Sequence, residues 1–413
     1  MSFENIDGIN MLTMDMVTTT AFAGVLLVLG YFFKKQFPLL ERLCMPAPVI
    51  GGVLFSVTAL ILRNTDTMQF TFNTALQVPF MIAFFTCVGF GGSFKLLKTG
   101  GIALGIFLAI CWVLSIIQNA VGVGLATALG MHPLMGVMAG TVSMTGGHGN
   151  AAAFGPKAEA LGAVGASTVA IAAATYGLIV GALIGGPVGQ YFIKKYNVKI
   201  ETQDVGLTEE EIKKSQEVVT GKITAEALMK HMVFVGVFMV LGTFINNAVN
   251  NIGIPNLVFP GYVGAMFLMI IFRNINDKFS IIKVDQNIMD TMRDVSLGFF
   301  LAMAIKTLRM WELVDLALPL LVILLVQTVI VLLMIRFVVW PLMGKNYDAA
   351  TMSAGFTGVG IGVTPTGIAS MASVNERYKK MSLKAMLIVP LCNAVFIDIV
   401  AIPNILFFLG AFS

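Results

Sequence analysis

Residues 141–155 read TVSMTGGHGNAAAFG and lie in the longest uncharged stretch of the chain, which runs from Thr99 to Pro156. A stretch of that length without Asp, Glu, Lys or Arg is typical of protein embedded in a membrane. Residues 146–150 nevertheless contain three glycines, a histidine and an asparagine, and this composition disfavours a continuous helix. The segment therefore predicts non-helical backbone at membrane depth, where lipid offers its polar groups no partners.

The composition of the whole chain agrees with a membrane protein. Of 413 residues, 57% are hydrophobic and 12% are charged, and the mean hydropathy is +0.88. So few charges cannot solvate the surface of a soluble domain, so we expect an all-α polytopic membrane protein. The net charge of +4 gives a nucleic-acid partner no electrostatic support. No CxxC spacing links the four cysteines, so neither a disulfide framework nor a zinc site is expected; they are Cys44, Cys87, Cys111 and Cys392.

Ten segments are apolar and long enough to cross a bilayer, which takes about 20 residues of helix. Two further apolar segments, 134–156 and 349–372, are too rich in glycine to be ordinary crossings, and we expect each to be a re-entrant hairpin. The ten expected crossings are 17–33, 47–62, 76–92, 101–127, 160–193, 231–249, 257–272, 288–305, 313–337 and 384–410.

The distribution of positive charge assigns the two sides of the membrane. If the N-terminus is outside and both hairpins return to the side they enter, all but four of the 26 Lys and Arg residues lie inside. Both termini are then outside, and the hydrophilic segment 194–230 is a cytoplasmic linker with a short amphipathic helix. The first basic residue, Lys34, follows the first apolar run, which is not the order of a cleavable signal. The four residues on the outer side are Arg63, Lys157, Lys306 and Arg309, and we expect Lys306 and Arg309 to snorkel.

The two halves of the chain repeat the same features in the same order. Each half contains five crossings, an odd number, so the second half enters the membrane in the opposite orientation. Two inverted repeats, residues 1–193 and 231–413, each with one broken segment, are typical of secondary transporters. The matching pairs are MPAPVIGG (45–52) with VFPGYVG (258–264), QNAVGVG (118–124) with QTVIVLL (327–333), and TGGHGN (145–150) with TGVGIGVTPT (357–366). Gln118 and Gln327 are partners in this repeat.

A helix-break-helix hairpin offers its own backbone as a binding site. Free N–H groups at the start of the second arm favour an anion, and carbonyl groups at the end of the first arm favour a cation. Two such hairpins from opposite faces would meet near mid-membrane and bind an anionic solute with a coupling cation. The alternative is that glycine only allows close helix packing, but GGHGN and GVGIG contain more glycine than packing needs.

Four stretches resemble the bacterial glutamate:sodium symporters, and the resemblance covers nearly the whole chain outside the linker. It implies uptake of L-glutamate with sodium across the bacterial cytoplasmic membrane. It also implies no cofactor besides the coupling ion, an elevator-type alternating access, and a homodimer. The stretches are VPFMIAFFTCVGF (78–90), SMTGGHGNAAAFG (143–155), PLMGKNYDAATMSAGFTGVGIGVTPTGIASM (341–371) and VPLCNAVFIDIV (389–400).

Asp398 is the strongest single candidate, because it is the only charged residue after Lys384 and falls inside an expected crossing. It would meet the substrate ammonium, a sodium ion or a basic structural partner. His148 would donate to a substrate carboxylate or hold the hairpin. The predicted substrate-binding residues are Ser143, Thr145, Gly146, Gly147, His148, Gly149, Asn150, Thr357, Gly358, Gly360, Gly362, Thr364, Thr366, Asn393 and Asp398.

The hydroxyl and amide side chains have two interpretations. The hydroxyls beside the breaks would bind sodium or carboxylate, or would bond back to their own helix. The amides Gln118, Asn119, Gln327 and Asn393 would complete the site or bridge helices. The sodium ligands that we expect are Asn119, Thr145, Thr364 and Asp398.

Three other functions fit the sequence less well. The chain has no HExxH, GxSxG or GxGD motif, so we do not expect an intramembrane enzyme. A channel would line its pore with one repeated filter, whereas this chain has two different hairpins. A symporter of citrate or another dicarboxylate would place an arginine in the binding region for the additional carboxylate. Neither hairpin contains an arginine, and Asp398 would receive an ammonium, so an amino acid is favoured.

Overall fold

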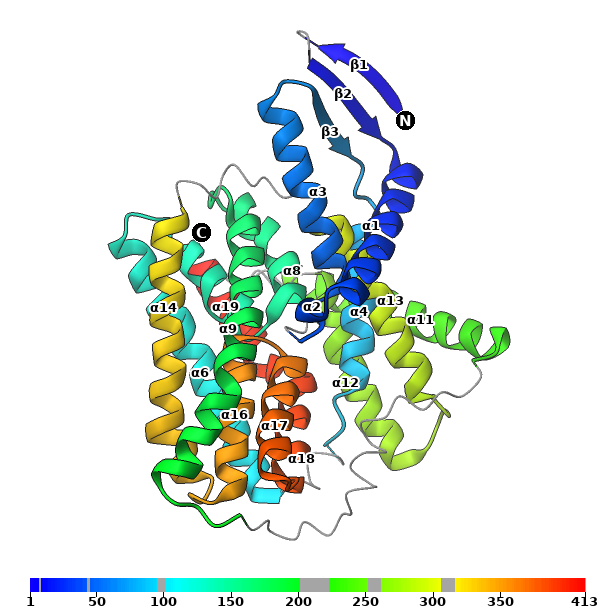
Figure 1. The fold of residues 1–413 in the computed structure, drawn as a ribbon. Coiled ribbons are helices and arrows are strands. Elements are labelled where there is room, and N and C mark those ends of the chain that lie inside the picture. The colour runs from blue at the N-terminus through cyan, green and yellow to red at the C-terminus, as the bar shows by residue number, and fades with distance from the viewer. Residues whose placement is uncertain are drawn as a thin grey trace.

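The computed structural model describes residues 1–6, 9–42, 45–94, 101–200, 223–251, 261–305 and 316–412. The chain is mostly helical, with one small sheet at the N-terminal end (Figure 1). Labels α and β denote helices and strands, and η denotes a π-helical turn. The first half contains β1 (Ser2–Ile6), β2 (Ile9–Met14), α1 (Met16–Gln36), α2 (Pro38–Arg42), α3 (Ala47–Asn64), β3 (Met68–Phe72), α4 (Gln77–Phe90), α6 (Gly101–Ala128), α7 (Pro133–Val137), η1 (Met138–Val142), α8 (Gly147–Ala160) and α9 (Ala166–Lys195). The second half contains α11 (Ala225–Asn251), α12 (Gly261–Phe279), α13 (Gln286–Ile305), α14 (Ala317–Met334), η3 (Ile335–Val339), α15 (Trp340–Leu342), α16 (Tyr347–Ile361), α17 (Thr364–Tyr378), α18 (Leu383–Leu391), η4 (Cys392–Phe396) and α19 (Asp398–Ala411).

A helix lies in each segment for which the sequence predicts a crossing. Six helical stretches among the described residues are long and apolar enough to span a bilayer: α1, α3, α6, α9, α11 and the run Ala317–Leu342. The last expected crossing, 384–410, is not one helix, because η4 separates α18 from α19. Lys306, Arg309, Cys44 and the expected amphipathic helix around residues 207–217 lie outside the described residues.

The helices form two groups that lie side by side (Figure 1). The first group contains α1, α3, α4, α11, α12 and α13, which pack on one another. The second group contains α6 to α9 and α14 to α19. The described packing between the groups involves chiefly α13 against α8 and α4 against η4. Each half of the chain thus supplies three helices to the first group before it enters the second.

The sheet at the N-terminal end is a feature that the all-α expectation missed. β1 pairs antiparallel with β2, with Glu4 opposite Met11, and β2 pairs parallel with β3, with Leu12 opposite Phe70. The ring of Phe55 on α3 lies 5.2 Å from that of Phe70 and 5.7 Å from that of Phe72. The sheet therefore rests on the end of the first group by aromatic packing, which sets its position although its strands are only five or six residues long.

Within the first group, α1 and α3 cross in backbone contact. A methyl group placed on Gly51 of α3 would lie 1.9 Å from the carbonyl oxygen of Leu26 on α1. A methyl group on Gly30 of α1 would lie 1.9 Å from the carbonyl oxygen of Ala47 on α3. Close approach of this kind is how small residues hold helices together where lipid supplies no hydrophobic drive.

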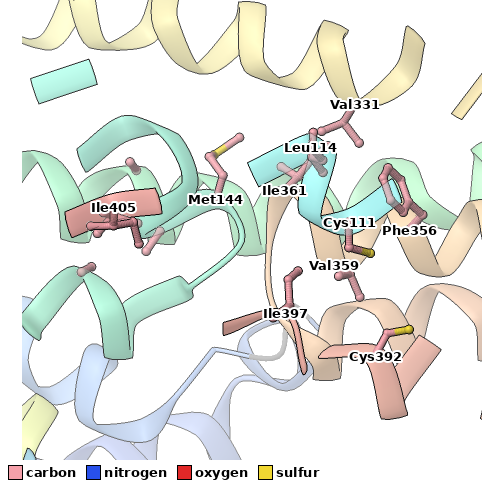
Figure 2. Close-up of a cluster of buried hydrophobic side chains, with 14 of the residues drawn as sticks. Cys111, Leu114, Met144, Val331, Phe356, Val359, Ile361, Cys392, Ile397 and Ile405 are labelled. Carbon is pink, nitrogen blue, oxygen red and sulfur yellow. The ribbon is translucent and has the colours of Figure 1, made fainter. Parts of the chain in front are cut away.

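Apolar side chains of the second group pack around α6, α14 and α16 (Figure 2), within a cluster that also contains Phe85, Tyr262 and Phe300 of the first group. Leu114 of α6, Val331 of α14 and Ile361 of α16 lie next to one another there. The ring of Phe356 meets Phe107 edge-to-face at 5.6 Å. Of the described cysteines, Cys111 and Cys392 are free thiols in this core and Cys87 is a free thiol in the first group. This core holds α16 against α6, and it thereby fixes where the break after α16 lies.

Gly51→Val should destabilise the protein by about 1–3 kcal/mol, because the added side chain would enter the backbone of α1. The measurement is the thermal unfolding of purified protein in detergent. Gly105→Val on α6 is the matched control, since no described atom lies within 4 Å of a methyl group there. The helix-propensity change is the same in both variants, so equal melting temperatures would contradict the close crossing of α1 and α3.

Candidate functional site

The first break lies between η1 and α8. Pro133 starts α7, and the His132 side chain accepts a hydrogen bond from the N–H of Leu134. Gly140 departs from helical geometry at φ −96° and ψ −131°. The chain then turns at Gly147, which has a φ of +63° and begins α8. Glycine adopts this left-handed conformation without the cost that a side chain would add.

The second break lies between α16 and α17. The Asn346 side chain caps α16 by accepting from the N–H of Ala349 at 2.9 Å. α16 ends at Ile361. Its C-cap Gly362 has a φ of −125° and a ψ of −119°, and Val363 is extended. Pro365 in the first turn of α17 starts the second arm, where its missing N–H costs nothing. Both breaks therefore fall inside the segments that the sequence predicts to be broken.

The two breaks meet. A methyl group placed on Gly147 would lie 2.3 Å from Cγ1 of Val363. The tip of the first break therefore touches the tip of the second, although 216 positions separate Gly147 and Val363 in the sequence. The start of α8 and the start of α17 thus lie side by side at one place in the protein.

Gln118 of α6 connects the two broken segments. Its amide nitrogen donates to the carbonyl oxygen of Gly360 at 2.7 Å, and its amide oxygen accepts from the hydroxyl of Thr145 at 2.7 Å. Gln327 of α14 donates in turn to the backbone carbonyl of Gln118 at 2.7 Å. Both glutamines are fully buried. Of the two interpretations that the sequence left open for these amides, the geometry favours bridging.

The side chain of Asn119 also hydrogen-bonds to the backbone. Its side-chain oxygen accepts from the N–H of Thr141 at 3.0 Å, which satisfies a donor in the non-helical part of η1. Its amide nitrogen has no hydrogen-bond partner among the described residues. A nitrogen donor cannot ligate sodium, so this geometry gives little support to Asn119 as a sodium ligand.

A cavity of about 440 Å³ lies where the two tips meet, a size that suits a small-molecule ligand. Its walls come from both breaks, from α4 and α13 of the first group, and from η4 and α19. Eight of the residues predicted for substrate binding line it: Thr145, Gly146, His148, Gly149, Asn150, Thr364, Asn393 and Asp398. The other seven do not line it: Ser143, Gly147, Thr357, Gly358, Gly360, Gly362 and Thr366.

Three of these seven residues carry a hydroxyl, and two of the three hydroxyls make structural hydrogen bonds. Ser143 donates to the carbonyl oxygen of Ala170 on α9 at 2.7 Å. Thr357 donates to the carbonyl oxygen of Ser353 in its own helix at 2.9 Å. The bonding of a hydroxyl back to its own helix, which the sequence left open, therefore holds for Thr357.

His148 lines the cavity and is buried. Its Nε2 lies 3.0 Å from the hydroxyl oxygen of Thr175, and that hydroxyl donates to the carbonyl of Ile171 at 2.9 Å. Nε2 is therefore the donor, which leaves Nδ1 of the neutral ring as an acceptor. Nδ1 is buried and has no partner among the described residues. A buried acceptor in a cavity wall is suited to a ligand N–H group.

Asp398 is the first residue of α19 and faces the same cavity. The side chain of Asn150, which also lines the cavity, lies close to its carboxylate, so the first break and this acid meet at the cavity. Asn393, five residues earlier, donates to the hydroxyl of Thr364 at 2.7 Å. The break in the last crossing segment thus brings one amide and one carboxylate to the two tips.

The sequence missed the contribution of α13. Arg293 and Asp294 line the cavity, with Phe84 of α4. Arg293 pairs through Nη1 with Asp290 at 2.9 Å and through Nε with Asp294 at 3.0 Å. The signal was present, because these charges fall inside the expected crossing 288–305 just as Asp398 falls inside 384–410. Arg293 was instead counted among the positive charges of the inner side.

The charges on the cavity wall determine which ligands the cavity can bind. Asp294 and Asp398 carry negative charge, Arg293 carries positive charge, and the start of α8 adds unpaired N–H groups and the positive end of a helix dipole. A ligand with both an ammonium and carboxylates finds an opposite charge for each group. Among the described residues, no cluster of three or more His, Cys, Asp and Glu is arranged to hold a metal ion.

The sequence matches a known protein family over most of its length. Residues 12–380 match the model of the sodium/glutamate symporter family. The chain is 36% identical over 399 residues to the sodium/glutamate symporter of Escherichia coli K12, an alignment that covers 94% of this chain and 96% of the relative. The chain belongs to the sodium/glutamate symporter family.

The symporter of Haemophilus influenzae is also 36% identical, over 393 residues that cover 94% of this chain and 95% of the relative. In the present chain, the two broken segments, Arg293 and Asp294 all lie within residues 12–380, which match the family model. Asn393 and Asp398 follow the end of the family match.

A double-mutant cycle tests the bridge of Gln118. Gln118→Met and Thr145→Val should each lower the free energy of unfolding, and their coupling energy should be about 0.5–3 kcal/mol because they share one buried hydrogen bond. The measurement is denaturant unfolding of the purified protein in detergent. Thr243→Val is the matched control, since its hydroxyl bonds only within α11, and it should add to Gln118→Met without coupling. Simple additivity of Gln118→Met and Thr145→Val would contradict the bridge.

Proposed function

We propose that this protein takes up L-glutamate together with sodium across the bacterial cytoplasmic membrane. The observation that carries the proposal is the cavity between the two helix breaks, whose wall combines a helix start, an acid and an arginine. Its family membership and the names of its relatives support the same function. Transport needs no covalent step, so no catalytic residue is required.

Each charged group of glutamate has a partner in the cavity. The α-carboxylate binds the N–H groups at the start of α8, where backbone donors and the helix dipole favour an anion. The ammonium binds between the carboxylate of Asp398 and Nδ1 of His148. The side-chain carboxylate faces Arg293 of α13, whose guanidinium keeps donors beyond those used by Asp290 and Asp294.

The charge of the cavity favours an amino acid over citrate or another dicarboxylate. The cavity wall contains one positively charged residue, Arg293, and two acidic residues, Asp294 and Asp398. Citrate, which has three carboxylates, would therefore be repelled by negative charge that the single arginine does not neutralise. Glutamate carries a net charge of −1 and gives its ammonium to an acid, which makes it the better match. Another small carboxylate remains the alternative, and the competition experiment below distinguishes the two.

The two helix groups support an elevator-type alternating access. The cavity lies at their border, with α4 and α13 on one side and the two breaks on the other. Packing across the border includes α13 with α8, α4 with η4 and the ring pair of Phe154 and Tyr262, and movement of one group against the other would exchange these contacts. We infer that the second group, which holds both breaks, carries the substrate.

The order of elements supports two inverted repeats, residues 1–193 and 231–413, joined by the cytoplasmic linker 194–230. Each repeat supplies three helices to the first group and one broken segment to the second. Both termini then lie outside. Apolar side chains exposed on α1, α11 and α14 are suited to lipid and to a second subunit, and we propose a homodimer.

Uptake of labelled L-glutamate into proteoliposomes under an inward sodium gradient tests this function. Replacement of sodium by potassium or choline should abolish uptake, and excess citrate should leave it unchanged. Uptake without sodium would contradict sodium coupling, and competition by citrate would move the substrate to another carboxylate.

Asp398→Asn should lower uptake by about 100-fold, because the ammonium loses a charged hydrogen-bond acceptor in a buried site. The amount and thermal stability of the purified variant should stay at the wild-type level. Asp66→Asn is the matched control, since Asp66 is exposed and its φ of 51° suits asparagine. Wild-type uptake by the Asp398 variant would remove this residue from the site.

Arg293→Gln should reduce the preference for L-glutamate over L-glutamine by about 10-fold, because only glutamate has a side-chain carboxylate to pair with the guanidinium. The measurement is the inhibition of labelled glutamate uptake by each unlabelled amino acid. Arg377→Gln at an exposed position of α17 should leave the ratio unchanged. A preserved ratio in the Arg293 variant would show that the side-chain carboxylate binds elsewhere.

A further inference from the structure

One buried hydroxyl beside the second break lacks the partner that its neighbours have. Thr366 in the first turn of α17 is fully buried, and its Oγ1 has no hydrogen-bond partner among the described residues. Thr351, Ser353 and Thr357 in α16 all donate to the carbonyl four residues earlier. Thr366 cannot do so, because the residue four positions before it is Gly362, whose backbone is not helical. The break itself therefore leaves this hydroxyl free.

The Thr366 hydroxyl faces a small cluster of oxygens. A methyl group placed on Gly362 would lie 2.9 Å from the carbonyl oxygen of Gly358, 3.2 Å from that of Gly177 and 3.2 Å from Thr366 Oγ1. These three oxygens come from α16, α9 and α17, and they are the three atoms nearest to that point. The methyl group of Thr366 lies 3.2 Å from where a methyl on Gly181 of α9 would lie, and the carbonyl oxygen of Gly358 lies 3.7 Å from the same point. The hydroxyl is thus aimed at the break.

A fourth oxygen lies close by. A methyl group on Gly177 would be 1.9 Å from the carbonyl oxygen of Ile361, so the last carbonyl of α16 lies against α9 at the same place. The end of a helix carries the negative end of its dipole, which adds to the negative potential of the carbonyls. The cluster is therefore rich in acceptors, and the Thr366 hydroxyl is its one side chain.

We propose that a sodium ion binds at this break, with the carbonyl oxygens of Gly358 and Gly177 and the hydroxyl of Thr366 among its ligands. Oxygen ligands suit hard cations, and carbonyl oxygens without a carboxylate suit a monovalent one better than a divalent one. The proposal rests on the sodium-coupled symport proposed above. It assigns a site apart from the substrate cavity, which Thr366 does not line, and it differs from the sodium ligands expected from the sequence.

The position of this site gives sodium a means to affect substrate binding. Thr364, two residues before Thr366, lines the cavity and accepts a hydrogen bond from Asn393. An ion that holds the first turn of α17 against α9 fixes Thr364 and, through it, Asn393. Sodium binding then orders one wall of the cavity before glutamate arrives, and the coupling between the two ligands is reciprocal.

Thr366→Val tests the site, because valine keeps the shape of threonine and removes only the hydroxyl. In proteoliposomes, the sodium concentration for half-maximal uptake at saturating glutamate should rise at least about 10-fold. Thr366→Ser, which keeps the hydroxyl, should stay within about 3-fold of wild type. Thr357→Val is the matched control on the other arm, since its hydroxyl is already satisfied by Ser353, and it should leave the sodium requirement unchanged.

Thermal unfolding without glutamate separates an ion site from a merely structural role. Sodium should raise the melting temperature of the wild-type protein and of Thr366→Ser relative to choline, but not that of Thr366→Val. In choline, Thr366→Val should melt at the wild-type temperature or above it, because valine removes an unpaired buried polar atom. A variant that melts lower than wild type equally in both salts would overturn the proposal in favour of a structural hydroxyl.

The failure of this site and the failure of the proposed function look different. Wild-type uptake that needs no sodium would remove both. Sodium-dependent wild-type uptake with an unchanged sodium requirement in Thr366→Val would overturn only this site. If Thr366→Val cannot be purified, Gly362→Ala is the alternative, because it places a methyl group among the same oxygens. This variant should also raise the sodium concentration needed for half-maximal uptake. An unchanged sodium requirement in Gly362→Ala would overturn the site.

Discussion

Backbone that leaves a helix inside a membrane must find its hydrogen-bond partners within the protein, and the rest of this structure depends on that constraint. The amide of Gln118 donates to the carbonyl of Gly360 in one broken segment and accepts from Thr145 in the other. The side chain of Asn119 satisfies the N–H of Thr141. Two adjacent amides on one apolar helix thus stabilise both breaks, and the breaks in turn place two helix starts beside one cavity.

The cavity lies at the border between the two helix groups. One apolar cluster continues across this border, for example from Phe154 of α8 to Tyr262 of α12, and polar and charged side chains from both groups line the cavity. A substrate site at such a border is what the proposed elevator-type movement of one group against the other requires. The close crossings, such as that of α1 and α3 at Gly51, hold helices of one group in backbone contact.

The buried polar residues of the two breaks separate into two kinds. Gln118, Ser143 and Thr357 have hydrogen-bond partners for their side-chain polar atoms and so maintain the breaks. Asn119 does so through its side-chain oxygen alone, since its amide nitrogen has no partner among the described residues. His148, Asn393 and Thr366 each keep an atom without a partner among the described residues. The second kind marks where ligands are expected, since a buried polar atom without a partner is costly. His148 and Asn393 belong to the substrate cavity, and Thr366 belongs to the proposed sodium site.

The sequence by itself determined the positions of the apolar helices, of the two breaks and of the acid Asp398, because hydrophobic length, glycine clusters and isolated charges are local properties of the chain. It favoured bridging and ligand binding equally for the amides, and it assigned Arg293 to the inner surface. Only the tertiary structure decided these points. Hydrophobic periodicity and composition do not show that Arg293 of α13 lies beside the tips of two segments that are each more than 60 residues away in the sequence. They also do not show that the Thr357 hydroxyl has a hydrogen-bond partner while the Thr366 hydroxyl has none among the described residues. These outcomes depend on which helices pack together across the chain, and no local pattern contains that information.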